Sequence, residues 1–544
     1  MTWSQTYLLF GQGLAFSALL AALPIFTLLL LLGVLRKASW IAGLSGLAVT
    51  FVLAIGAYHM PVVTAVSAAA DGAAFGLFPI SWIIFWAIAL FRVTEETGKF
   101  EIIRHSVSRL TPDRRLQAVL IAFAFGAFLE GAAGFGTPVA IAATMLTGLG
   151  FPAFTASALC LLANTAPVAF GSIGIPVVTL AGTTGLPLDK LSAAVGSYCA
   201  PVSLILPAYL IVATWGLRGF AGIWVPTAIA GAAFASVQFA ISNFIGPQLT
   251  DILASLTAMV MLVVVLRFRH PATHNASEYL AEKTTTEGIA EHSTAEVIYA
   301  WLPYGLLVIC VLLWGYKPFQ AWLNLGSVAI RWPFLHNMVR RMPPIVGQAA
   351  PYPAIFNLNW FSAAGTSCMV ATLLSAVCLR MSLKHFARVL ISVARTLLLP
   401  TVTVTSVLAI AFLMNYCGAT ATLGLAFSAT GRMFPFFSSL LGWLGVFLTG
   451  SDTSANALFG GLQVVTAGKL GLDPILMAAT NSAGGVMGKM ISLQTIAVAA
   501  AATGLSVSDQ AKVFRFTLKH SVLLASVVGG LALLYVYVFH LRWS

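Results

Sequence analysis

Long apolar segments separated by short polar loops extend along the whole chain. Two of them are residues 23–35 (LPIFTLLLLLGVL) and residues 521–539 (SVLLASVVGGLALLYVYVF). Neither shows the alternation of apolar and polar positions that marks the strands of a membrane β-barrel. A helix needs about 20 apolar residues to cross the hydrocarbon core. The pattern therefore predicts an all-α polytopic membrane protein, and the length of the chain accommodates about 12–14 transmembrane helices.

The most polar stretch lies near the middle of the chain, at residues 274–294 (HNASEYLAEKTTTEGIAEHST). It predicts a division into an N-terminal membrane half (1–266), a polar cytoplasmic loop (267–296) and a C-terminal membrane half (297–544). Basic residues gather in other short loops, and the positive-inside rule places such loops in the cytoplasm. Residues 316–358 are then expected outside, although Lys317, Arg331, Arg340 and Arg341 go against the rule.

Composition agrees with a membrane protein, because 59% of the residues are hydrophobic, 8% are charged and the mean hydropathy is +0.94. A net charge of +12 would suggest nucleic acid as the partner of a soluble protein. Here the basic loops are explained by topology, so we expect a lipid bilayer and no nucleic acid. The six cysteines show no CxxC spacing, and we predict neither a disulfide framework nor a metal site or cofactor. The N-terminus lacks the basic region of a signal peptide, so the first span is expected to be retained.

One interruption of the apolar pattern, at residues 128–140 (FLEGAAGFGTPVA), combines an acid, glycines and a proline. Glycine frees the backbone, and proline removes a helical hydrogen bond. A charged acid at the centre of a membrane helix costs about 2.5–3.5 kcal/mol on insertion scales. The residues therefore predict a broken helix with an acid, Glu130, at the break.

The interruption recurs in the second half of the chain. GAFLEG (126–131) corresponds to GVFLTG (445–450), and NTAPVAFG (164–171) corresponds to NSAGGVMG (481–488). Glycine-rich packing faces of membrane helices could match in this way by chance. However, the two matches are linked at nearly equal spacing, and broken segments at corresponding positions of two halves indicate the binding site of a transporter. Free helix N-termini at such breaks favour an anion.

Four long motifs resemble the L-lactate permease family, and the resemblance covers nearly the whole chain. The motifs are EGAAGFGTPVAIAA (130–143), NTAPVAFGSIGIP (164–176), GWLGVFLTGSDTSANALF (442–459) and NSAGGVMGKMIS (481–492). The resemblance implies uptake of L-lactate, with glycolate and D-lactate as further candidates, together with protons across the bacterial inner membrane. It also implies two inverted repeats with re-entrant hairpins. One departure is Leu493, which stands where the family usually has proline.

Two acids are candidates for proton coupling, Glu130 and Asp452, because each lies in a broken apolar segment where a neutral, protonated carboxyl is favoured over a charged one. The hydroxyl groups of Ser451, Thr453 and Ser454 surround Asp452 and make it the preferred candidate. The alternative is a permanently ionised carboxylate that caps a helix or binds Na⁺.

The candidate substrate contacts belong to the same broken segments. Lys489 could pair with a substrate carboxylate or with either acid, or extend to the membrane interface. Asparagine-containing hairpin tips are implied by the resemblance, and helix–helix hydrogen bonding is the alternative. Tyr416 is a weaker candidate. The predicted substrate-binding set is Gly131, Gly134, Asn164, Thr165, Tyr416, Thr453, Ser454, Asn481, Ser482 and Lys489.

These features favour a secondary carrier of a small 2-hydroxy monocarboxylate. A membrane enzyme would need a catalytic His/Cys/Ser set or a metal cluster, and the sequence contains no such pattern, so we predict that the chain is not an enzyme. A channel would not require paired broken repeats. A Na⁺-coupled carrier of another small carboxylate remains the alternative. Lactate and glycolate differ by one methyl group, which a pocket distinguishes by only about 1–3 kcal/mol.

Overall fold

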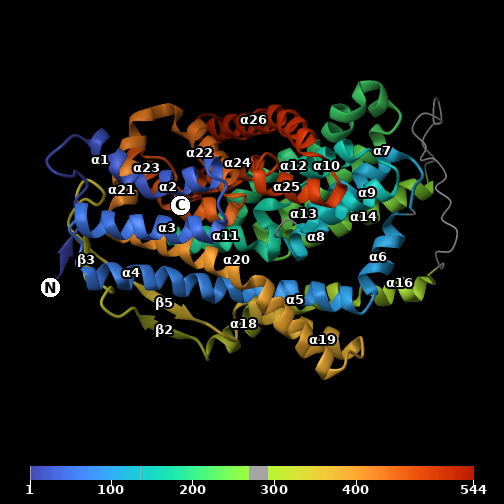
Figure 1. The fold of residues 1–544 in the computed structure, drawn as a ribbon, viewed down its shortest axis with the longest axis horizontal. Coiled ribbons are helices and arrows are strands. Elements are labelled where there is room, and N and C mark those ends of the chain that lie inside the picture. Colours follow the sequence, from blue (N-terminus) through green and yellow to red (C-terminus); the bar gives the residue numbers. More distant parts are fainter. Residues whose placement is uncertain (1, 109, 135–136, 269–291, 544) are drawn as a thin grey trace.

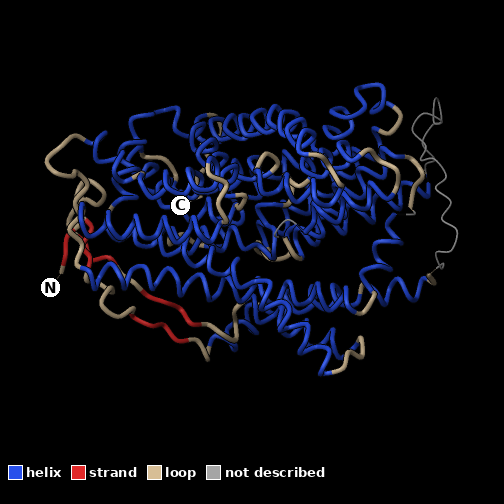
Figure 2. The backbone as a smooth tube through the Cα atoms, viewed as in Figure 1, coloured by secondary structure: helices blue, strands red, loops and turns tan. Residues whose placement is uncertain are grey.

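The computed structural model describes residues 2–108, 110–134, 137–268 and 292–543. Within these ranges the chain is mostly helical, as the apolar pattern predicts, with a few short strands (Figures 1 and 2). Ten helices of the described ranges are long and apolar enough to cross a membrane, or up to 13 if each of three bent helix pairs is one span. The prediction of an all-α polytopic membrane protein is confirmed. Most of the predicted polar loop (267–296) lies outside the described residues.

The helices of the first half are numbered in chain order, and η marks a short π-helical or 3-10 segment. They are α1 (Leu14–Ala21), α2 (Leu23–Leu29), η1 (Leu30–Val34), α3 (Ser39–Val52), η2 (Leu53–Ala57), α4 (Val62–Phe75), η3 (Gly76–Ser81), α5 (Trp82–Glu96), α6 (Lys99–Ser108), α7 (Arg114–Gln117), η4 (Ala118–Phe125), α8 (Gly126–Ala132), α9 (Thr137–Gly148), α10 (Ala153–Ala163), η5 (Val168–Phe170), α11 (Gly171–Thr184), α12 (Leu188–Ala221), α13 (Trp224–Phe244) and α14 (Thr250–Phe268).

The second half continues the same numbering. Its helices are α16 (Thr294–Ala300), α17 (Leu302–Gly315), α18 (Lys317–Asn324), α19 (Ala364–Cys378), α20 (Leu383–Cys417), α21 (Ala419–Phe427), η6 (Ser428–Met433), α22 (Phe434–Thr449), α23 (Asp452–Leu470), α24 (Pro474–Lys489), α25 (Leu493–Thr503) and α26 (Val507–Tyr537). The strands are β1 (Trp3–Ser4), β2 (Val328–Arg331), β3 (Val339–Arg341), β4 (Ala350–Tyr352) and β5 (Ile355–Leu358).

The strands and the N-terminus lie at one end of the molecule, and α6 and α16 lie at the opposite end (Figure 1). Strand β3 pairs with β1 in parallel and with β4 antiparallel, whereas β2 pairs antiparallel with β5 in the register Val328↔Leu358. The sequence predicted residues 316–358 only as an external segment. These strands are short and rich in nearby prolines, so they lack the long alternation by which a strand is recognised.

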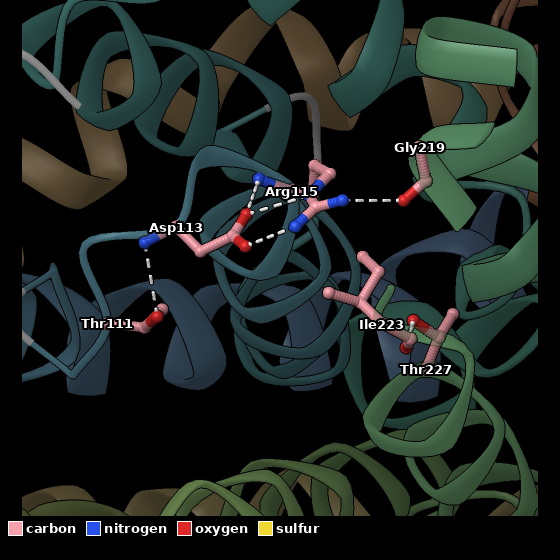
Figure 3. A network of polar contacts seen from close by, with 6 residues as sticks. All are labelled: Thr111, Asp113, Arg115, Gly219, Ile223 and Thr227. Atoms are coloured by element: carbon pink, nitrogen blue, oxygen red, sulfur yellow. Dashed lines mark hydrogen bonds and ion pairs between the residues drawn. The ribbon is translucent and has the colours of Figure 1, made fainter. Parts of the chain in front are cut away.

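An ion pair fastens the connection between helices at the end opposite the strands (Figure 3). Asp113 accepts hydrogen bonds from the backbone and guanidinium of Arg115, with Nη2 at 2.7 Å from Oδ2. Arg115 Nη1 also donates to the carbonyl of Gly219 at 2.9 Å, so the start of α7 is tied to the end of α12. From there η4 and α8 pass through the interior, where every residue from Leu116 to Ala132 is buried.

The doubled motifs correspond to a doubled order of elements. α8, a break, α9, a turn, α10, a second break and α11 are repeated as α22, a break, α23, a turn, α24, a second break and α25. The first breaks both contain a glycine with positive φ, Gly134 at 61° and Gly450 at 71°, where other residues are strained. The α10–α11 pair is bent by 64°.

The two sets of helices contact each other reciprocally. Helix α9 packs against α25, and the corresponding pair α23 and α11 also pack together. Thr144 of α9 donates to the Ala502 carbonyl of α25 at 3.3 Å, and Asn456 of α23 donates to the Pro176 carbonyl of α11 at 3.2 Å. A two-fold relation between the two sets produces such reciprocal contacts, in which each helix of one set packs on the matching partner of the other set. The inverted orientation of the two sets stays a prediction.

Candidate functional site

A cavity of about 360 Å³ lies where the breaks of the two helix sets meet. The ends of α8 and α24, the starts of α11 and α25 and the break between α22 and α23 all contribute to its wall, together with α2, α3 and α20. The polar residues of the lining are Ser39, Glu130, Ser172, Thr403, Thr449, Ser451, Asp452, Thr453, Ser454, Lys489, Gln494 and Thr495. Lys489 is the one basic residue in this lining. Parts of the segments that the sequence singled out therefore line a common cavity.

Lys489 and Glu130 form an ion pair across the two sets. Lys489 Nζ donates to Glu130 Oε1 at 2.7 Å, and the two residues are only 8% and 3% exposed. Of the partners that the sequence left open for Lys489, the structure shows Glu130. A Cβ atom at Gly171 would lie 2.9 Å from Glu130 Oε1, so a residue without a side chain lets α11 approach the carboxyl group. Glu130 Oε2 is buried and has no hydrogen-bond partner among the described residues.

Asp452 is the second acid of the cavity, and it accepts hydrogen bonds on one side only. Ser482 Oγ donates to Oδ2 at 2.6 Å, and Asn456 Nδ2 donates to the same oxygen at 3.2 Å. Within the described ranges, the other oxygen, Oδ1, is buried without a partner. Two buried amides extend this network away from the cavity: Asn481 donates to Asn456 at 2.9 Å, and Gln463 donates to Asn481 at 3.0 Å.

The predicted residues divide into two layers. Glu130, Asp452, Thr453, Ser454 and Lys489 line the cavity. Asn481 and Ser482 lie behind it and contact Asp452 directly or through Asn456. The sequence predicted Asn481 and Ser482 as substrate contacts, but in the structure both residues support the lining of the cavity from behind.

The remaining predicted residues do not line this cavity in the structure. Gly131 packs against Asp251, and Gly134 packs against Ser172. Asn164 and Thr165 are buried in the break between α10 and η5, where Asn164 Nδ2 has no hydrogen-bond partner among the described residues. Tyr416 lines a different cavity, nearer the strands.

The start of α11 has an unusual backbone. Ser172, Ile173 and Gly174 have φ values of 47°, 60° and 76°, so three successive residues are left-handed. The left-handed conformation costs about 1–2 kcal/mol for each residue with a side chain. Ser172 Oγ donates to the Ala133 carbonyl at 3.1 Å, which joins the two breaks of the first set. Backbone strain of this kind is typical of functional sites, because only a surrounding structure that enforces it can maintain it.

The sequence did not single out Asp251, which lies in the first turn of α14. It is 1% exposed, and both carboxyl oxygens are buried without a well-aligned hydrogen bond among the described residues, although the Gln238 side chain lies nearby. It packs against Gly131 and interacts electrostatically with Glu130 and Lys489. The available signal was an acid immediately before the apolar run of residues 252–266. Ser172, Asn456 and Gln494 were also missed.

The cavity and its surroundings contain more buried carboxyl groups than basic groups. Three buried carboxyl groups, those of Glu130, Asp251 and Asp452, interact with the single ammonium of Lys489. Full ionisation would leave two uncompensated buried charges, and a buried charge without a partner is strongly unfavourable. The site therefore has the groups to bind one anion and to hold protons. In the described residues no group of three or more His, Cys, Asp or Glu side chains is arranged to hold a metal ion.

Comparison with known proteins gives a consistent family. The family model described as L-lactate permease matches residues 17–539. The chain is 43% identical to glycolate permease GlcA of Escherichia coli and 42% identical to an L-lactate permease of Bacillus subtilis, in each case over 99% of both chains. Among solved structures, Neisseria gonorrhoeae MtrF aligns with 86% of this chain and 83% of its own, at 12% identity and a TM-score of 0.45.

Proposed function

Because the chain belongs to the L-lactate permease family, we propose that it carries L-lactate or glycolate into the cell together with a proton. The chain is a multi-pass membrane protein of a transporter family, and in this proposal it performs no chemical reaction. The observation that supports the proposal most directly is the buried Lys489–Glu130 ion pair in the wall of the cavity.

Lys489 is the anchor for the substrate carboxylate in this proposal. Its ammonium is already desolvated and held by a carboxylate, Glu130, at 2.7 Å. An incoming monocarboxylate offers the same chemical group and can take the place of Glu130. The hydroxyl groups of Thr453 and Ser454 lie in the same wall and suit the 2-hydroxyl group of the substrate.

Displacement of Glu130 explains why a proton accompanies the anion. A carboxylate that loses its only counter-ion inside the membrane is unfavourable, and protonation removes the charge. Asp452 provides a second acid for this purpose, since only one of its oxygens accepts hydrogen bonds. The site holding one anion and one extra proton has the same net charge as the empty site. Anion and proton then bind cooperatively, with a coupling free energy typically of about 1–3 kcal/mol.

The asparagines of the repeated N-x-A-x-x-x-x-G motif support this site in our proposal, although Asn481 lies inside α24 and not at the expected hairpin tip. Asn481 holds Asn456, which donates to Asp452, and Asn164 occupies the corresponding position of the first set. The two sets are related by a pseudo-two-fold axis in the plane of the bacterial inner membrane, with residues 1–266 and 297–544 as the two halves and residues 267–296 as a cytoplasmic loop. The reciprocal packing of α9 on α25 and α11 on α23 supports the two-fold relation.

Exchange of labelled substrate tests the substrate and the anchor together. Proteoliposomes loaded with unlabelled L-lactate should take up labelled L-lactate, and glycolate should compete while a dicarboxylate such as succinate should not. Lys489→Gln should abolish the exchange. Lys512→Gln, which alters an exposed lysine paired with Asp509, is the matched control and should exchange normally. Normal exchange by Lys489→Gln would refute the assignment of the anchor.

A further inference from the structure

A second cavity of about 530 Å³ lies near the strands, at the end of the molecule that also holds the N-terminus. Its wall includes Asp71 of α4, the end of α11, the end of α20 and the chain between β4 and the residues after β5. The polar residues of the lining are Asp71, Thr183, Thr184, Tyr352, Asn357, Asn359, Asn415 and Tyr416. None of the functions proposed above uses this cavity.

The same two helices line both cavities. Helix α11 contributes Pro176 to the first cavity and Ala181 to the second, and α20 contributes Val407 to the first and Phe412 to the second. In each helix the two residues are five positions apart, which is about 7.5 Å along the axis. The cavities are therefore separated by a layer of little more than one helical turn.

Hydrogen bonds close this layer. Asn415 Nδ2 donates to the Thr183 carbonyl at 3.1 Å and joins α20 to α11. Asn456 Nδ2 donates to the Pro176 carbonyl at 3.2 Å and joins α23 to α11 on the side of the first cavity. Both bonds join a side-chain amide to a backbone carbonyl of α11, so α11 is held by one such bond on the side of each cavity.

The second cavity lies on the side that the positive-inside rule places outside. The basic segment that contains Lys99 and Arg104 belongs to α6, at the end opposite the strands (Figure 1). Arg114 and Arg115 follow it at the start of α7. Basic loops of this kind face the cytoplasm, which places the strands and the second cavity at the external surface.

Asp71 is the one charged residue in the lining of the second cavity. It is 4% exposed, and none of the described residues forms a hydrogen bond with its carboxyl group. The titratable groups that share the cavity are the hydroxyls of Tyr352 and Tyr416, and Arg341 stacks on the Tyr352 ring from outside the lining. A lone carboxyl group with amide and hydroxyl oxygens suits a small cation and repels an anion.

We infer that the second cavity is the outer entrance to the transport path and that Asp71 takes up a proton there. Ionised Asp71 repels an arriving monocarboxylate, and protonated Asp71 admits it. The proton and the anion therefore enter together at the entrance as well as in the first cavity. This inference rests on the proposed function for the identity of the cargo, but the location of the entrance and the charge of Asp71 can be measured without transport.

Thiol labelling in membrane vesicles tests the location. With the exposed Cys378 replaced by serine, a membrane-impermeant thiol reagent should modify Thr184→Cys in right-side-out vesicles, and Thr453→Cys, behind the layer, more slowly from the same side. Thr184 lines the second cavity and Thr453 lines the first. Labelling of Thr184→Cys only from the cytoplasmic side would overturn the inference.

The charge of Asp71 is tested with two reagents of opposite charge on Thr184→Cys. The ratio of anionic to cationic labelling rates should rise by about tenfold or more as the external pH falls, because a nearby unit charge is neutralised. The ratio is independent of the ionisation of the thiol, since both reagents attack the same thiolate. In Asp71→Asn the ratio should be constant, whereas Asp189→Asn, at an exposed acid, should behave as the parent.

A ratio that does not change with pH in the parent, or a change that persists in Asp71→Asn, would overturn the role of Asp71. If the labelling agrees with the inference and labelled L-lactate is not exchanged, the entrance stands and the proposed cargo is wrong. If L-lactate is exchanged and the labelling disagrees, the proposed function stands and this entrance is wrong.

Discussion

Lys489 Nζ lies 2.7 Å from Glu130 Oε1, although 359 residues of chain separate the two. The pair joins the end of α24 to the end of α8, so it links the two repeated sets of helices at their breaks. Both side chains are buried, so each charge is compensated by the opposite charge of its partner. The ion pair therefore brings one residue from each of the two repeated motifs to the wall of the same cavity.

Breaking this pair from one side should destabilise the protein strongly. Lys489→Met leaves Glu130 buried without a counter-ion, and loss of one partner of a buried pair costs about 3–5 kcal/mol. The double variant Glu130→Gln/Lys489→Met removes both charges and should recover most of that loss, while substrate exchange stays absent. Thermal unfolding of the purified proteins in detergent measures both effects. A double variant as unstable as Lys489→Met would contradict the dependence of one charge on the other.

Neutralising Asp452 should uncouple the movement of lactate from the movement of protons. Asp452→Asn keeps hydrogen-bonding capacity toward Ser482 and Asn456 but cannot exchange a proton, so it should retain lactate exchange and lose accumulation driven by a pH gradient. Glu130→Gln is the parallel test. Asp509→Asn, at a partly exposed acid paired with Lys512, should accumulate lactate normally. Undiminished accumulation by both Asp452→Asn and Glu130→Gln would place the proton site elsewhere.

Removing Asn481, inside α24, or Asn164, at the end of α10, should weaken substrate binding without a large effect on expression. Asn481→Ala leaves Asn456 unsupported beside Asp452, and Asn164→Ala alters the corresponding position of the first set. A neutral hydrogen bond such as the one from Asn481 to Asn456 contributes about 0.5–1.5 kcal/mol, so the apparent KM should rise about twofold to tenfold. Initial uptake rates over a range of lactate concentrations give the KM. Asn243→Ala, at a residue that bonds only within its own helix end, is the control, and an equal KM in all the variants would refute the assignment.

Alanine substitutions at two glycines with positive φ should separate the cost of a steric clash from the cost of the left-handed backbone. Gly174 (φ 76°) lies in the first turn of α11, and a Cβ atom there would lie 2.8 Å from Pro247, whereas Gly185 (φ 71°) has open space around it. Gly185→Ala should cost only the left-handed conformation, about 1–2 kcal/mol. Gly174→Ala adds the clash, so its thermal unfolding temperature should fall further. Equal temperatures for the two variants would show that the approach of α11 to Pro247 does not constrain the site.

The sequence predicted most of the breaks because their signals are local, but residues 481–488 lie inside the continuous helix α24, and the break follows at Met490. Glycine, proline and asparagine mark the interruption wherever it occurs, and the two motif pairs correspond to the doubled order of helices. Glu130 and Asp452 line the cavity as expected for acids in broken segments. The sequence did not predict which acid Lys489 contacts, because no local pattern indicates which of several distant acids a lysine will meet in the fold.

The rest of the site depends on tertiary packing that a single sequence does not reveal. Asn481 lies behind the lining because α24 packs between α22 and α23. Asp251 was missed because an acid in the first turn of a helix is an ordinary feature, and only packing against Gly131 gives it significance. Asp71 was missed because the segment around it is rich in small residues, and only its place in the lining of the second cavity gives this acid significance.

Accumulation of L-lactate in proteoliposomes under imposed ion gradients tests the central claim most directly. Purified protein is reconstituted with equal salt on both sides, and uptake of labelled L-lactate is followed after the external pH is lowered, or after a sodium gradient is imposed at constant pH. The ion pair of Lys489 and Glu130, with no net charge change on loading, predicts accumulation above the external concentration with the pH gradient, abolished by a protonophore and insensitive to the membrane potential. Accumulation driven by sodium alone, or none under either gradient, would contradict the account.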